Sequence, residues 1–193
     1  MYLHKESVPA MAAIKKEFVF TNDSRAMYPL LNEIITYLKN HLASEQYAFK
    51  ISNCKQILIE LLTNAVKHSN ADTTTIHVAL TGQSIELTKS DKGRKFYLNN
   101  YTSWPPLTWP LEQKYIGEKL KIYQDDISNL FATIQTENRI IFEIEEYPIT
   151  QVTSNSNLLE HYGLLIMAKF SNEFFYLYNE EQNLNQFTTV IYV

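Results

Sequence analysis

The sequence predicts an α/β chain of the α+β type, folded as a two-layer α/β sandwich whose mostly antiparallel sheet is covered on one face by helices. Two long stretches, at about 24–42 and 52–70, repeat their apolar residues with helical spacing. Pairs of short segments rich in β-branched and aromatic residues are joined by turns, which predicts antiparallel hairpins. Because helices are separated from hairpins along the chain, a doubly wound parallel sheet is disfavoured.

Composition narrows the class of protein. The chain has 193 residues, which suits a single domain over 1–193. A net charge of -4 gives no reason to expect nucleic acid or an acidic membrane as a partner. No apolar stretch is long enough for a signal peptide or a membrane span, so we expect a cytoplasmic protein. The single cysteine, Cys54, is expected to be a small buried side chain.

The first half is expected to hold most of the regular structure. Polar residues at 22–24 can cap a helix, and β-branched residues at 73–80 favour a strand. In order we expect a strand at 16–21, a helix to about Leu42, a connector at 43–51, a helix from Ser52 or Asn53 to about 69, a strand at 73–80, a turn at 82–83, a strand at 84–89 and a turn at 90–93.

The second half is less regular. Two tryptophans and three prolines fall within 97–110, where Trp104 and Trp109 are expected to pack over the sheet edge and not to form a partner surface. Beyond it we expect a helix at 111–130, a hairpin at 131–147 turning near Glu137 and Asn138, a polar loop at 148–157, a helix at 157–172 and a hairpin of 173–178 with 187–193.

A line of polar residues follows the edge of the second predicted helix. It consists of Glu60, Asn64, Lys67 and His68, and the last three lie within about 80° of Glu60 around the helix axis. An amide oxygen can bind Mg²⁺, a carboxylate can orient or deprotonate a nucleophile, and the cations can face phosphates. The alternative is an ordinary solvated helix edge.

The segment that carries this line, ELLTNAVKH, resembles the N-box of the histidine kinase, gyrase and heat-shock-chaperone-like ATPase superfamily. It looks most like the version in bacterial anti-sigma-factor serine/threonine kinases. The resemblance implies that Asn64 holds Mg²⁺ and that Glu60 is the catalytic base or positions the attacking group. It also implies that Lys67 and His68 lie near the phosphates of ATP.

Further segments resemble the superfamily's other motifs in the expected order. In SDKGRKF, Asp91 and Gly93 match an Asp-x-Gly-x-Gly turn whose Asp accepts a hydrogen bond from the adenine amino group, and Lys95 replaces the second glycine. In HYGLLIM, Gly163 matches a phosphate-wrapping glycine, while His161 stands where another glycine belongs and either blocks the approach or meets a phosphate. The alternatives are a plain turn for Asp91 and a structural role for His161.

The last motif is a Gly-Thr-Thr strand that faces the base. Thr188 and Thr189 match it, and Phe187 replaces the glycine, although threonines are also ordinary strand residues. The resemblance covers about 16–96 and 157–193. The segment between them, about 97–156, is an atypical insert that we expect to be a nucleotide lid with added strands.

Two functional hypotheses follow. By resemblance, the chain is a signal-transduction domain that binds ATP and Mg²⁺ and phosphorylates or sequesters a regulatory protein, such as a sigma factor or an anti-anti-sigma-like protein. An active enzyme would be a serine/threonine protein kinase or an ATPase, with a homodimer as one form of assembly. The missing glycines support the alternative of a degenerate, nucleotide-free copy that binds a partner protein.

Overall fold

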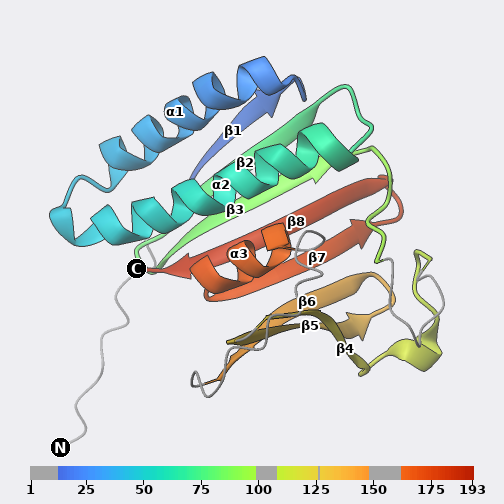
Figure 1. The fold of residues 1–193 in the computed structure, drawn as a ribbon. Coiled ribbons are helices and arrows are strands. Elements are labelled where there is room, and N and C mark those ends of the chain that lie inside the picture. The colour runs from blue at the N-terminus through green and yellow to red at the C-terminus, as the bar shows by residue number, and fades with distance from the viewer. Residues whose placement is uncertain (1–12, 99–107, 126, 148–161) are drawn as a thin grey trace, which may run out of the picture.

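The computed structural model describes residues 13–98, 108–125, 127–147 and 162–193. The α+β prediction is confirmed: helices cover one face of an eight-stranded antiparallel sheet (Figure 1). The strands are β1 (Ile14–Phe20), β2 (Thr74–Leu80), β3 (Ser84–Asp91), β4 (Lys119–Gln124), β5 (Ser128–Thr136), β6 (Arg139–Glu146), β7 (Glu173–Asn179) and β8 (Leu184–Tyr192). The α-helices are α1 (Ser24–His41), α2 (Ala48–His68) and α3 (Tyr162–Phe170), and the sheet order is β1-β2-β3-β8-β7-β6-β5-β4.

Helix α1 follows its sequence prediction closely. Asp23 is the N-cap, and its side chain accepts a hydrogen bond of 2.9 Å from the backbone N–H of Arg25. The apolar stripe is buried against the sheet and α2, with Leu30, Leu31, Ile34 and Leu38 in the core. Burial of this stripe fixes which face of α1 meets the sheet.

Helix α2 starts earlier than predicted. The expected connector at 43–51 contains a short 3₁₀ turn at Glu45–Tyr47, and α2 begins directly after it at Ala48. The polar residues Ser52 and Asn53 resemble N-caps in the sequence, but they lie inside the helix. Ile51 is buried, so the apolar stripe of α2 extends about one turn further towards the N-terminus than predicted.

The predicted helix at 111–130 is wrong. This segment contains a short 3₁₀ turn at Gln113–Tyr115, then β4 and the start of β5. A register shift between Lys121 and Tyr123 interrupts the alternation of β4, and both Ile122 and Tyr123 are buried. A bulge of this kind moves apolar residues out of the two-residue period of a strand, which made their spacing look helical.

The insert extends the sheet. Strands β4, β5 and β6 lie beyond β7, and β5 and β6 form the predicted hairpin with Glu137 and Asn138 at its turn. Strand β6 pairs with β7 over only three residue pairs, from Arg139↔Leu177 to Ile141↔Phe175. The predicted loop at 148–157 and the first residues of the predicted helix at 157–172 lie outside the described residues.

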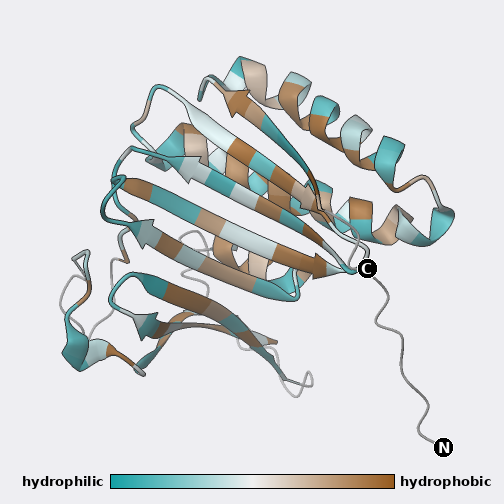
Figure 2. Cartoon of the chain, turned by 180° about the vertical axis from the view of Figure 1, so that it is seen from behind, coloured by the Kyte–Doolittle hydropathy of each residue, from teal (hydrophilic) through white to brown (hydrophobic). Residues whose placement is uncertain are grey.

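The two faces of the sheet differ. Alternate residues of the central strands, such as Ile76, Val78, Ile85 and Leu87, are buried under the helices. In the part of the chain that the structure describes, no helix covers the other face, which is turned towards the viewer in Figure 2. None of the described helices is long and apolar enough to cross a membrane.

Candidate functional site

The polar edge of α2 changes in exposure along its length. Glu60 and Asn64 are half-buried, whereas Lys67 and His68, in the last turn, are exposed. The neighbouring apolar stripe of the helix is fully buried, which fixes the direction in which this edge points. Burial of Glu60 and Asn64 means that a second element covers the middle of the edge.

That second element is α3. A Cβ atom built at Gly163 would lie 2.7 Å from Oε2 of Glu60 and 3.7 Å from Nδ2 of Asn64. Gly163 is the second residue of α3, so the first turn of this helix packs directly on the polar edge of α2. Three residues predicted to share a site therefore lie together, although α3 is distant from α2 in the sequence.

The environment of Glu60 favours its neutral form. Burial raises the pKa of this carboxyl, and the positive charge of Lys67 partly opposes the rise. A carboxylate with a raised pKa is a stronger base when it is ionised. Glu60 therefore has chemistry suited to accepting a proton beside Asn64.

The loop after β3 is bound to the C-terminal end of α2. The backbone N–H of Arg94 donates a 2.6 Å hydrogen bond to the carbonyl oxygen of Ser69. A Cβ atom at Gly93 would lie only 1.6 Å from that oxygen, so this position has no room for any side chain. The sequence indicates that Gly93 is a turn residue. The structure shows a further reason for glycine at this position, which is the close approach of the loop to the end of α2.

Asp91 is part of a buried network of polar side chains. Its Oδ2 is 2.5 Å from the ammonium of Lys89, and the side chains of Lys89 and Asp91 are 5% and 1% exposed. Its Oδ1 accepts hydrogen bonds from the backbone N–H of Gly93, at 2.9 Å, and from Nδ2 of Asn185, at 3.2 Å. The carboxylate predicted to bind adenine is therefore already neutralised by an internal cation.

Sequence reasoning missed Lys89 and Asn185. A signal existed for Lys89, because residues two apart on a strand point to the same face of the sheet. Lys89 and Asp91 both belong to β3, and they share the face that carries Ile85 and Leu87. Asn185 could not be found from local sequence, because it meets Asp91 only through the pairing of β3 with β8.

Positive charge surrounds the end of α2. The pKa of His68 is lowered, first by partial burial and then by the charges of Lys67, Lys89 and Arg94. Three cations thus act on one imidazole at the junction of α2, β3 and the following loop. An anion placed there would be stabilised.

The two predicted threonines lie on opposite faces of the sheet. Thr189 is on the helix-covered face, and its hydroxyl donates to the carbonyl oxygen of Leu87 at 3.4 Å. Thr188 is on the other face, with its hydroxyl 2.9 Å from that of Thr88. The structure therefore places only Thr189 on the side of Asp91 and α2.

Large side chains replace two of the expected glycines. They are Phe187 and Lys95. Phe187 lies opposite Lys89 in the β3–β8 pairing, and the centre of its ring is 5.4 Å from the ammonium of Lys89. Phe187 packs edge-on against Phe96 at 5.1 Å. Lys95 donates a 3.2 Å hydrogen bond to the carbonyl oxygen of Trp109, and so ties the loop after β3 to the start of the insert.

The prediction that Trp109 packs into the protein is confirmed. Trp109 is 7% exposed, its indole N–H donates to the carbonyl oxygen of Phe96 at 2.6 Å, and its ring contacts Tyr176. Trp104 and His161 lie outside the described residues. The position that His161 was expected to share with Gly163 therefore stays a prediction.

The residues present suit one kind of metal site. Among the described residues, no group of three or more His, Cys, Asp or Glu side chains could hold a metal ion. Mg²⁺ that arrives with a triphosphate needs only one or two protein ligands, because phosphate oxygens and water supply the others. Asn64 and Glu60 both approach Gly163, and the Asn64 amide could be the protein ligand of an Mg²⁺ ion that is bound mainly by phosphate oxygens and water.

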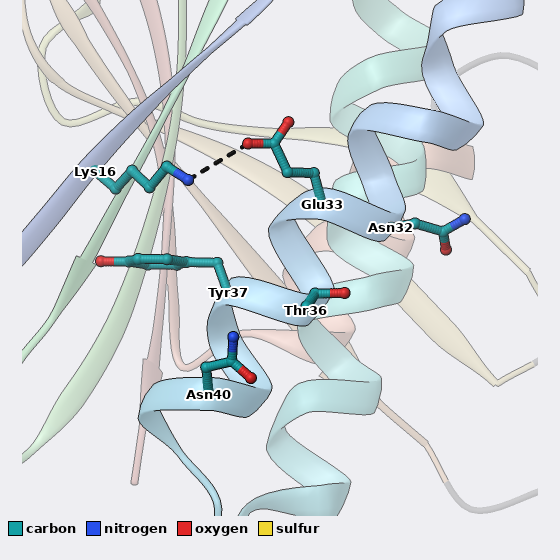
Figure 3. Close-up of a pocket in the computed structure, with 6 residues that line it drawn as sticks. All are labelled: Lys16, Asn32, Glu33, Thr36, Tyr37 and Asn40. Atoms are coloured by element: carbon teal, nitrogen blue, oxygen red, sulfur yellow. Dashed lines mark hydrogen bonds and ion pairs between the residues drawn. The ribbon is translucent and has the colours of Figure 1, made fainter.

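A surface hollow lies elsewhere, between β1 and α1. Its volume is about 350 Å³, and it is crossed by an ion pair of 3.4 Å between Lys16 and Glu33 (Figure 3). It is lined by Lys16, Asn32, Glu33, Thr36, Tyr37 and Asn40. None of the predicted site residues belongs to it, so it supports no part of the predicted nucleotide site.

Comparison with known proteins adds no family. No family model matches the chain. No curated protein matches it either.

Proposed function

We propose that the chain is a regulatory domain that binds ATP with Mg²⁺ where α2, α3 and the loop after β3 meet. The observation that carries the proposal is the contact of Gly163 with Glu60 and Asn64. A glycine at the start of a helix, an amide and a carboxylate come together from distant parts of the chain. The superfamily that the sequence resembles has motifs with these residue types in the same order along the chain.

Each group has a distinct role in the proposal. Asn64 holds Mg²⁺, which would neutralise charge on the phosphate oxygens when it is bound. Lys67 and Arg94 attract the triphosphate with charges that both act at the end of α2, and His68, whose pKa burial and these charges lower, offers a neutral imidazole N–H to a phosphate oxygen. Glu60, with its raised pKa, orients or deprotonates the attacking group.

The bound nucleotide would act on a partner. In the anti-sigma-factor kinases that the sequence resembles, the γ-phosphate passes to a serine or threonine of a regulatory protein. We propose the same class of partner here, a sigma factor or an anti-anti-sigma-like protein. The nucleotide either supplies the phosphate or sets the affinity for this partner.

Thermal unfolding with and without ATP and Mg²⁺ tests the proposal. A ligand at ~100 times its dissociation constant stabilises the native state by about 2.7 kcal/mol. For a chain of this size that raises Tm by roughly 5–10 °C. An unchanged Tm at millimolar ATP with Mg²⁺ would overturn the proposal.

Asn64→Ala tests the metal position in the same experiment. We expect the variant to lose the part of the ATP-induced Tm shift that depends on Mg²⁺, because the amide oxygen is removed. Asn40→Ala, at an exposed position of α1, is the matched control and keeps the full shift. If Asn64→Ala responds to Mg²⁺ like wild type, Asn64 does not hold the metal.

A second candidate function is a nucleotide-free module that binds a partner protein. The buried Lys89–Asp91 pair and the packing of Phe187 favour it, because both occupy the side of the site where a base would lie. In that case ATP, with or without Mg²⁺, leaves Tm unchanged. The same melting experiment therefore separates the two functions.

A further inference from the structure

We propose that Lys89 is a specificity-determining residue that donates a hydrogen bond to N1 of adenine. The neighbouring amino group of the base would donate a hydrogen bond to Asp91. This inference rests on the proposed ATP-binding function and adds a residue to it. It starts from a buried ammonium whose hydrogen-bonding capacity is mostly unused. In this inference the Lys89–Asp91 pair forms hydrogen bonds with adenine. In the second candidate function the same pair instead occupies the place where adenine would bind.

Lys89 is almost completely removed from solvent. Its side chain is 5% exposed, and Oδ2 of Asp91 is the one hydrogen-bond acceptor it has among the described residues. A lysine ammonium carries three N–H donors. Two of them therefore have no acceptor within the described protein, and a buried donor without a partner is costly.

The neighbours of Lys89 have no similar capacity to spare. The amide nitrogen of Asn185 lies within 3.3 Å of three acceptors, which are Oδ1 of Asp91 and the carbonyl oxygens of Gly93 and Arg94. The carbonyl oxygen of the Asn185 side chain accepts from the hydroxyl of Tyr176 at 2.7 Å. A ligand that needs a donor in this network would therefore find it at Lys89.

The pair matches the edge of adenine. Oδ2 of Asp91 has one donor in the described protein, and a carboxylate oxygen accepts two hydrogen bonds. An acceptor and a donor thus lie side by side, 2.5 Å apart. Adenine offers the complementary pair on neighbouring positions, with the amino group as donor and N1 as acceptor.

The buried ammonium acts electrostatically on the end of α2. The loop that follows Asp91 is hydrogen-bonded to Ser69, next to the exposed His68 at the end of α2, and the charge of Lys89 contributes to the lowered pKa of His68. Phe187 places an aromatic ring with its centre 5.4 Å from the ammonium. A purine that enters beside His68 would meet a flat ring and a donor–acceptor pair at the same place.

The test compares ATP with 1-deaza-ATP, in which N1 is replaced by a C–H group. Isothermal titration calorimetry with Mg²⁺ measures both dissociation constants on the full chain. We expect wild type to bind ATP about tenfold more tightly, since one buried hydrogen bond is lost with the analogue. Lys89→Met is expected to bind both nucleotides with the same, weaker affinity.

Lys92→Met is the matched control, because Lys92 is an exposed lysine in the loop directly after β3 and should keep the tenfold preference. A purely structural role for Lys89 would lower Tm in Lys89→Met and leave the preference intact, and that result overturns the inference. If Lys89→Met does not fold, the comparison of the two nucleotides on wild type still decides. Equal affinity overturns the inference alone, whereas binding of neither nucleotide overturns the proposed function and the inference with it.

Discussion

Gly93 lies where the loop after β3 crosses the end of α2, and substitution there should be severe. In Gly93→Ala the new Cβ would stand 1.6 Å from a backbone oxygen, and backbone cannot move aside as a side chain can. We expect a loss of about 2–4 kcal/mol in unfolding free energy, measured by urea denaturation.

Two other glycines provide controls for that measurement. Gly82→Ala should be nearly neutral, because nothing lies within 4 Å of the new Cβ. Gly163→Ala should cost less than Gly93→Ala, since the atom it meets is the end of the flexible Glu60 side chain. Equal losses at Gly93 and Gly82 would contradict the close approach of the loop to Ser69.

His68 should make stability depend on pH. Its folded-state pKa lies below the ordinary value of 6.5, so the unfolded chain binds the proton more readily. The unfolding free energy is therefore lost as pH falls from about 6.5 through the folded-state pKa. His68→Gln should reduce this loss between pH 8 and pH 5 and have little effect on it above pH 8.

Urea denaturation at pH 5, 6 and 8 checks this expectation. His41→Gln, at an exposed position of α1, is the control and should follow wild type. If His68→Gln loses as much stability as wild type between pH 8 and pH 5, burial and the neighbouring cations do not lower the pKa of His68 as the structure indicates.

At the scale of elements, the sequence best predicts the helices and strands whose ends and buried face are marked by local signals. Helix α1 has a capping residue and an unbroken apolar stripe, and both lie where they were predicted. Strand β4 has neither signal, because its bulge shifts Ile122 and Tyr123 to the buried side together. The start of α2 was misplaced because Ser52 looks like a cap, and the true start at Ala48 has no side-chain cap.

In the candidate site, too, some residues could be predicted from local sequence and others could not. Glu60 and Asn64 could be predicted because they share one helix face, and Gly163 because the motif order places it there. The partners of Asp91 could not be predicted in full, since Asn185 reaches it only through the β3–β8 pairing. Thr188 and Thr189 both match the motif in the sequence but cannot face one site, because neighbouring residues of a strand point to opposite faces.

At the scale of the whole molecule, the sheet has a narrow seam between β6 and β7. Three residue pairs join these strands, whereas seven join β7 to β8. Opening a short contact of this kind exposes fewer backbone hydrogen bonds than opening the sheet elsewhere. We therefore expect the amides of β4, β5 and β6 to exchange with solvent faster than those of β2, β3 and β8.

Ile140→Ala sharpens this prediction, because Ile140 is fully buried and lies opposite Tyr176 at the centre of the seam. Losing this side chain should cost about 2–4 kcal/mol. Hydrogen exchange read by mass spectrometry should show the loss mainly in β4, β5 and β6. Ile76→Ala, an equally buried change in β2, should instead raise exchange in the part of the sheet that carries Asp91. If either substitution raises exchange equally in both parts, the eight strands open as one cooperative unit, and the insert is as firmly integrated as the strands that build the site.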